Sequence, residues 1–173
     1  MLSDLGWTAA EPVLEVDTYY SRPDVDFMQT VECLRVRQRE DFAEITYKPA
    51  STTTTHSANS VISKPETNVH LASAAQAALA DRLLESIGMR LLVRVEKNRT
   101  AYRLPRHPDV TISIDTLADA GVFVETEAIS EDAEAAAHTV EQIEKQLDIV
   151  DAPAVELPYR DLALRRKSGA LKV

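Results

Sequence analysis

Basic side chains recur at alternate positions in segments that have the composition of β-strands. Arg35, Arg37 and Arg39 lie in CLRVRQRE, and Lys97 and Arg99 lie in VRVEKNRTAYR. Side chains of a strand alternate between its two faces, so residues i and i+2 point the same way. Each row therefore projects guanidinium or ammonium groups from one face, an arrangement suited to binding phosphate oxygens. A solvated outer face of an antiparallel strand would give the same spacing.

Carboxylates recur in the same manner further along the chain. Asp115 lies in VTISIDTL, and Glu125 and Glu127 lie in VFVETEAIS. A short connection at residues 118–121 predicts that the two segments form a hairpin, which would bring these acids close together. Mg²⁺ and Mn²⁺ prefer carboxylate oxygens and often share substrate phosphates as further ligands. The alternative interpretation is an acidic surface patch.

The elements that must position these residues predict an α+β fold with a mainly antiparallel sheet. The clearest helix pattern covers residues 73–87, with Leu79, Leu83, Leu84 and Ile87 on one stripe, and a second covers 132–147, with Ser130 as its N-cap. Strands are predicted over residues 13–21, 32–40, 42–47, 62–70, 91–104, 110–117 and 122–129, with a surface loop at 49–60 and a short last segment at 159–164. Pro105 and Pro108 are expected to end the long strand at 91–104.

Within the predicted hairpin, apolar and polar residues alternate. Ile112 and Ile114 oppose Ser113 and Asp115. If helices cover the apolar faces from outside, the polar faces curl inward and line a hydrated tunnel. Such a tunnel suits an anionic ligand, whereas a barrel that carries an apolar ligand should have an apolar interior.

Composition narrows the class of partner. The 173 residues suit one domain, and the formal net charge of −9 argues against nucleic acid as the main partner. The single cysteine, Cys33, excludes an intrachain disulfide, favours a reducing cytoplasm and is interpreted as a buried, inert thiol. No apolar run has membrane-spanning length, so we expect no membrane association.

In their order along the chain, these segments resemble the CYTH superfamily, the triphosphate tunnel metalloenzymes. The resemblance rests on EVDTYY, CLRVRQRE, ITYKPA, KPETNV, VEKNRTAYR, VTISIDTLADAGVFVETEA and PYRDLAL, and it covers nearly the whole chain. The class IV adenylate cyclase branch is the most similar. The family implies an antiparallel eight-stranded tunnel that holds a triphosphate, with helices packed outside.

The resemblance assigns roles residue by residue. Phosphate binding falls on Arg35, Arg37, Lys48, Lys97 and Arg99, and metal binding, by Mg²⁺ or Mn²⁺, falls on Asp115, Glu125 and Glu127. Lys64 and Glu66 match a basic–acidic motif more loosely, and Tyr159 matches a tyrosine without an assigned role. Catalytic residues are not assigned.

One family motif, an ExExK strand at the start, has no counterpart in this sequence. We therefore expect a single CYTH-like domain over residues 1–173, shortened at its N-terminus and incomplete by its first strand. Three activities stay open: conversion of ATP to cyclic AMP and pyrophosphate, hydrolysis of a triphosphate such as thiamine triphosphate, and triphosphate or polyphosphate binding without catalysis. A homodimer is also left open.

Overall fold

A computed structural model of the chain describes residues 2–52, 55, 61–118, 120–155 and 157–167. The predicted loop at 49–60 falls largely on residues 53–54 and 56–60, which lie outside the described residues. Across the described ranges, no helix is both long enough and apolar enough to cross a membrane.

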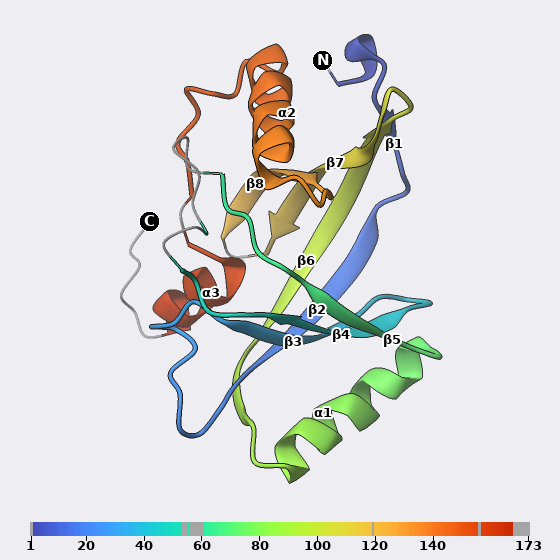
Figure 1. The fold of residues 1–173 in the computed structure, drawn as a ribbon. Helices are drawn as coiled ribbons and strands as arrows, with labels where there is room; N and C mark the ends of the chain where they lie inside the picture. The colour runs from blue at the N-terminus through green and yellow to red at the C-terminus, as the bar shows by residue number, and fades with distance from the viewer. Residues whose placement is uncertain (1, 53–54, 56–60, 119, 156, 168–173) are drawn as a thin grey trace. The chain divides into compact units, whose positions relative to one another are not determined.

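Eight antiparallel strands form one sheet (Figure 1). They are β1 (Thr8–Ala9), β2 (Val13–Ser21), β3 (Cys33–Gln38), β4 (Ala43–Lys48), β5 (Thr67–Leu71), β6 (Arg90–Leu104), β7 (His107–Leu117) and β8 (Gly121–Ala128). Hydrogen-bonded neighbours follow the order β5-β4-β3-β2-β6-β7-β8, and β1 pairs with β6. β5 and β8 are the two end strands of this hydrogen-bonded order. The α+β fold with an antiparallel sheet is thus confirmed.

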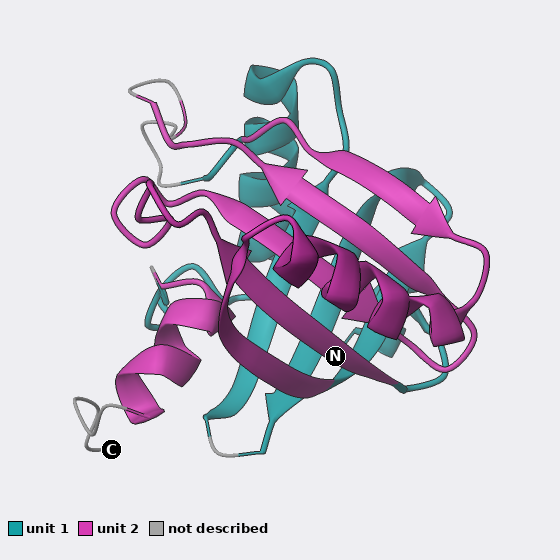
Figure 2. Ribbon diagram, turned by 90° about the horizontal axis from the view of Figure 1, so that it is seen from below, with its two compact units in different colours: residues 1–13, 56–63, 98–155 teal, residues 14–55, 64–97, 156–173 magenta. Residues whose placement is uncertain are grey.

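The chain divides into two compact units, which Figure 2 shows in different colours. Unit 1 contains residues 1–13, 56–63 and 98–155, and unit 2 contains residues 14–55, 64–97 and 156–173. Each unit is assembled from separate stretches of sequence. The expected single domain over residues 1–173 stays a prediction.

In unit 2, helix α1 (Ala77–Ser86) follows the short 3-10 helix η2 (Ala74–Gln76) and packs against β3 and β4. Its buried residues are Ala77, Ala80 and Leu84, which join Tyr20, Val36 and Ala43 in one apolar cluster. The predicted stripe is only partly buried, because Leu79, Leu83 and Ile87 are more than half exposed. The small side chains of Ala77 and Ala80 face the sheet together with Leu84, whereas Leu79 and Leu83 of the predicted stripe lie outside this contact.

In unit 1, helix α2 (Ala133–Gln146) packs against β8. Its N-cap is Asp132, whose carboxylate accepts hydrogen bonds from the backbone N–H groups of Glu134 and Ala135. The prediction of Ser130 as N-cap is therefore wrong; the Ser130 hydroxyl instead accepts from the N–H of Asp132. An aspartate two residues later serves the same purpose directly.

Two further boundaries differ from the predictions. Pro108 lies inside β7, near its start, where a residue without an N–H is tolerated. The last segment, predicted at 159–164, forms a longer helix, α3 (Tyr159–Lys167). Gly6, by contrast, ends the 3-10 helix η1 (Ser3–Leu5) with a left-handed φ of 86°, which agrees with the sequence, where Leu5-Gly6-Trp7 has the pattern of a helix end. The β7–β8 hairpin is paired as predicted, with Leu117 opposite Gly121.

Candidate functional site

The register of unit 2 places the predicted arginines on one polar face. Arg37 pairs with Asp17 on β2 and with Glu44 on β4, and Arg35 pairs with Tyr19 and Thr46 in the same way. Residues directly opposite each other in an antiparallel ladder share a face. The alternation of CLRVRQ thus produces rows that cross three strands.

Arg37 and Asp17 form the most completely bonded pair on this face. The Nε and Nη2 atoms of Arg37 donate to the two carboxylate oxygens of Asp17, each at 2.7 Å, and both residues are buried. Burial alone would raise the pKa of Asp17, but the hydrogen bonds from Arg37 and the charges of Arg35, Arg37 and Lys97 hold it well below its usual value. Asp17 is consequently ionised in the folded protein.

Glu15 is a second buried carboxylate on the same face, with an exposed fraction of 0%. Arg39 donates to Glu15 Oε1 from Nε at 2.7 Å, and its Nη2 forms an ion pair with the same oxygen. The other oxygen, Oε2, lies 3.4 Å from Arg37 Nη2 and 3.2 Å from Lys97 Nζ. The Glu15 carboxylate thus interacts with three cations: Arg37 on β3, Arg39 just after β3, and Lys97 on β6.

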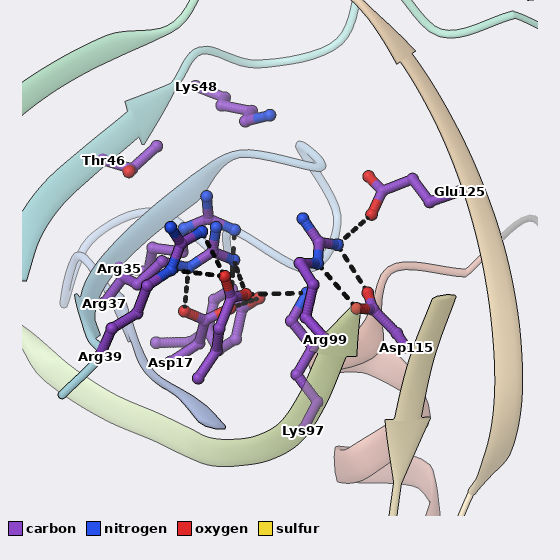
Figure 3. Close-up of polar contacts among 12 residues, drawn as sticks. Asp17, Arg35, Arg37, Arg39, Thr46, Lys48, Lys97, Arg99, Asp115 and Glu125 are labelled. Atoms are coloured by element: carbon purple, nitrogen blue, oxygen red, sulfur yellow. Dashed lines mark hydrogen bonds and ion pairs between the residues drawn. The ribbon is translucent and has the colours of Figure 1, made fainter. Parts of the chain in front are cut away.

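We call this group the arginine–carboxylate cluster: Glu15, Asp17, Arg35, Arg37, Arg39 and Lys97. Figure 3 shows Arg35 and Arg37 beside the Asp17 carboxylate, with Arg39 next to them. Four basic side chains face two carboxylates, so the formal charge of the cluster is +2. It is a concentrated and largely desolvated positive region, which is the environment that a polyanion requires.

Arg35 is the least engaged cation of the cluster. Its Nη1 lies 3.6 Å from Asp17 Oδ2, which is an ion pair without a short hydrogen bond. Its buried Nε has no hydrogen-bond partner among the described residues. A buried N–H group without an acceptor is costly, and a bound anion would relieve that cost.

Helix α3 contributes an aromatic side chain, Tyr159, to the surroundings of Lys97. The Lys97 Nζ lies 4.9 Å from the centre of the Tyr159 ring, within the range of a cation–π contact. The next residue, Arg160, is almost fully buried and donates to the carbonyl oxygens of Phe27 and Glu32 and to Asp161. This anchor fixes the start of α3, so Tyr159 is held in place.

The remaining predicted residues of unit 2 are engaged elsewhere. Lys48 forms an ion pair of 2.6 Å with Glu66, and Lys48 lies on β4 opposite Cys33, two positions from Arg35 along β3. Lys64 donates to the carbonyl oxygens of Val31 and Pro49 at 2.6 and 3.1 Å. The predicted strand at 62–70 is shorter than expected, because Lys64 and Glu66 both precede β5. In this structure, Lys64 ties two loop segments together.

Unit 1 holds a smaller group, the Arg99 cluster, which consists of Arg99, Asp115 and Glu125. Arg99 donates to the two oxygens of Asp115 at 2.7 and 2.6 Å, and its Nη2 also donates to Glu125 (Figure 3). Asp115 is fully buried, whereas 47% of the Glu125 side chain is exposed. Two of the predicted metal-binding acids thus lie within reach of one guanidinium.

The acids of unit 1 do not form a metal centre as they stand. Asp115 and Glu125 are both bonded to Arg99, and Glu127 is exposed opposite Thr111. Over the described part of the chain, no group of three or more His, Cys, Asp or Glu side chains could hold a metal ion. Carboxylates are the right donors for Mg²⁺ or Mn²⁺, but here a guanidinium neutralises them. The assignment of a metal to Asp115, Glu125 and Glu127 stays a prediction.

Sequence reasoning missed Glu15 and Asp17 as members of the site. Their i, i+2 spacing on β2 was a usable signal, since it projects both carboxylates to one face. Cys33 agrees in part with its prediction: it is half-buried, and burial raises the pKa of its thiol against the opposing charges of Arg35, Lys48 and Arg160. A raised pKa favours the protonated thiol, which is the less nucleophilic form.

Comparison with known proteins places this geometry in a family. The family model for the CYTH domain matches residues 2–156, which is most of the chain. No curated protein matches the chain significantly.

Solved structures share the fold at low identity. The PH1819 protein of Pyrococcus horikoshii is 24% identical with a TM-score of 0.78, covering 94% of this chain and 90% of its own. A proposed adenylate cyclase of Vibrio parahaemolyticus is 17% identical with a TM-score of 0.70, covering 88% and 81%. A proposed adenylyl cyclase of Hippeastrum, described as having a dominant triphosphatase activity, is 15% identical with a TM-score of 0.61, covering 99% and 90%. At these identities the likeness establishes the fold.

Proposed function

Since the chain belongs to the CYTH family, we propose that its arginine–carboxylate cluster binds the phosphate chain of ATP or of another organic or inorganic triphosphate. The cluster supplies forked guanidinium donors and one ammonium on a single face of unit 2. Planar guanidinium groups match pairs of phosphate oxygens, and the low exposure of the site strengthens each such contact. Lys48, on β4 opposite Cys33, extends the row on this face.

One observation carries this proposal: the buried Nε of Arg35, which lacks a hydrogen-bond partner among the described residues. Arg37 and Arg39 are bonded to Asp17 and Glu15, and their geometry is explained by those acids alone. Arg35 is not explained in this way. Its buried donor belongs to a cluster of formal charge +2, for which a phosphate oxygen would be the matching acceptor.

For the reaction, we propose adenylate cyclase chemistry of the class IV type. In this reaction the ribose 3′-hydroxyl attacks the α-phosphorus of ATP, and pyrophosphate leaves. The cluster would bind the phosphates and stabilise the charge that develops on the leaving pyrophosphate. The name of the Vibrio parahaemolyticus neighbour supports this choice.

Triphosphate hydrolysis is the second candidate, and the activity reported for the Hippeastrum neighbour favours it. There water attacks the terminal phosphorus, and the same cations would hold the two phosphates that leave. The third candidate is binding without turnover. It is favoured by the state of the Arg99 cluster, whose acids are bonded to an arginine.

The proposal also includes a metal ion and a cellular location. We propose a requirement for Mg²⁺ or Mn²⁺ with Asp115, Glu125 and Glu127 as ligands, and a cytoplasmic location. The net charge of −9 supports a small anionic partner over nucleic acid.

The binding part is tested by calorimetric titration of tripolyphosphate and ATP into the wild type and Arg35→Gln. Loss of Arg35 should weaken binding by about 1.5–3 kcal/mol, the usual worth of a charge-assisted hydrogen bond. Arg94→Gln is the matched control, because Arg94 is exposed on β6 and pairs with Glu96. Equal affinity of the wild type and Arg35→Gln would show that the phosphate chain does not lie on this face.

The reaction is decided by measuring cyclic AMP and released phosphate in parallel from ATP, with and without Mg²⁺ or Mn²⁺. Cyclic AMP with pyrophosphate supports the cyclase, and inorganic phosphate supports the triphosphatase. Binding without either product supports the third candidate.

A further inference from the structure

Glu15 occupies an unusual position for an acid in a site that must attract anions. Its carboxylate is fully buried and interacts with Arg37, Arg39 and Lys97, three of the four cations of the arginine–carboxylate cluster. The Oε2 atom lies between Lys97 Nζ and Arg37 Nη2, at 3.2 and 3.4 Å. These distances are those of an anion that bridges two cations.

We infer that Glu15 is the chain's own occupant of an anion position, and that it sets the affinity of the cluster for phosphate. This inference rests on the proposed function and goes beyond it, because it assigns to an acid the role of weakening anion binding. A triphosphate that enters the cluster either displaces the Glu15 carboxylate from Lys97 and Arg37 or lies beside it. In both cases its negative charge opposes that of the ligand.

Asp17, the other acid of the cluster, is arranged differently. It makes a two-bonded pair with Arg37 and accepts a hydrogen bond from the Tyr19 hydroxyl at 3.3 Å. Its oxygens are thus committed to fixed donors, and we assign it to the framework that holds Arg37. Glu15 differs because its Oε2 makes ion pairs at longer range with two cations from different strands. That is the weaker arrangement and the one that a phosphate oxygen can replace.

The inference predicts a result opposite to that of an ordinary binding residue. Glu15→Gln keeps the size and an acceptor oxygen for Arg39 but removes the negative charge. We expect tripolyphosphate to bind Glu15→Gln about tenfold more tightly than the wild type, measured by calorimetry in EDTA so that no metal takes part. A loss of affinity, or no change, would overturn the inference.

The matched control is Glu96→Gln. Glu96 is the neighbour of Lys97 on β6, but its side chain is exposed and pairs with Arg94. This variant changes the net charge by the same amount, so a general charge effect would tighten binding in both variants equally. We expect less than a twofold change in Glu96→Gln.

A second pair of variants protects the test against poor folding of Glu15→Gln, which leaves two buried cations, Arg37 and Lys97, without that acid. Arg39 is one third exposed and pairs with Glu15. The double variant Arg39→Gln/Glu15→Gln therefore removes one cation together with the acid, and Arg39→Gln is the single variant with which it is compared. The double variant should bind tripolyphosphate at least about threefold more tightly than Arg39→Gln alone. Equal or weaker binding by the double variant overturns the inference. Absence of binding to the wild type and to every variant would overturn the proposed function as well.

Discussion

The arginine–carboxylate cluster of unit 2 and the Arg99 cluster of unit 1 use the same chemistry at different depths. In unit 2, Asp17 and Glu15 are both buried, and each interacts with more than one cation. In unit 1, a single guanidinium holds one fully buried acid, Asp115, and one that is half exposed, Glu125. The first cluster has cations in excess, and the second has acids in excess.

The sign of the excess charge in each cluster indicates which kind of ligand that cluster suits. An excess of buried cations attracts an anion, and one of them, Arg35, retains an N–H group without a partner among the described residues. An excess of acids around one arginine suits a cation that can replace the arginine. The same residue types therefore predict phosphate binding in unit 2 and metal binding in unit 1.

The largest effect should come from Asp17→Asn. Breaking a buried ion pair leaves Arg37 without its two-bonded partner, which typically costs about 3–5 kcal/mol of unfolding free energy. Urea denaturation at pH 7 measures the loss. The pH dependence checks its cause: the folded-state pKa of Asp17 lies below its usual value, so its contribution is complete above about pH 4 and is lost as the pH falls through the folded-state pKa. A gap between wild type and variant that stays constant from pH 7 to pH 3 would contradict this account.

A smaller effect is expected from Asp115→Asn. Asp115 is fully buried and accepts two hydrogen bonds from Arg99, so we expect a loss of about 1.5–3 kcal/mol of unfolding free energy. Glu125→Gln, on the same hairpin, is the control, and it should cost about 0–1 kcal/mol because its side chain is half exposed. If Glu125→Gln destabilised the protein as much as Asp115→Asn, exposure would not be the property that separates these acids.

The smallest effect concerns metal. If Asp115 and Glu125 bind a cation, as we propose, Arg99 competes with it, so Arg99→Gln should bind Mn²⁺ several-fold more tightly than the wild type, as measured by electron paramagnetic resonance. Adding Asp115→Asn to Arg99→Gln should abolish the gain. A gain that persists in the double variant would place the metal away from Asp115.

The sequence predicted much of the fold because strand periodicity is a local property. The spacing of Arg35 and Arg37 was sufficient to predict that they share a face, and the β7–β8 hairpin followed from its alternation and its turn. The helix at 73–87 was located, but its buried side was not, since close packing against β3 and β4 selected Ala77 and Ala80 over Leu79 and Leu83. Which face is buried depends on residues far away in the sequence.

The site was predicted less completely for the same reason. Glu15 and Asp17 contact arginines more than 15 residues away, and only the β2–β3 register brings them together. Lys64 was assigned from its match to a family motif, but its ammonium group donates hydrogen bonds to the carbonyl oxygens of Val31 and Pro49. Residue type and spacing therefore identified the donors of the site and missed the acids that hold them.

The central claim is that a phosphate chain lies along the arginine–carboxylate cluster, and a crystal structure of the protein with a non-hydrolysable ATP analogue tests it most directly. The account predicts a phosphate oxygen about 2.7–2.9 Å from Arg35 Nε, the length of a charge-assisted hydrogen bond. A bound analogue whose phosphates make no hydrogen bond to Arg35, Arg37, Arg39 or Lys97 would contradict it.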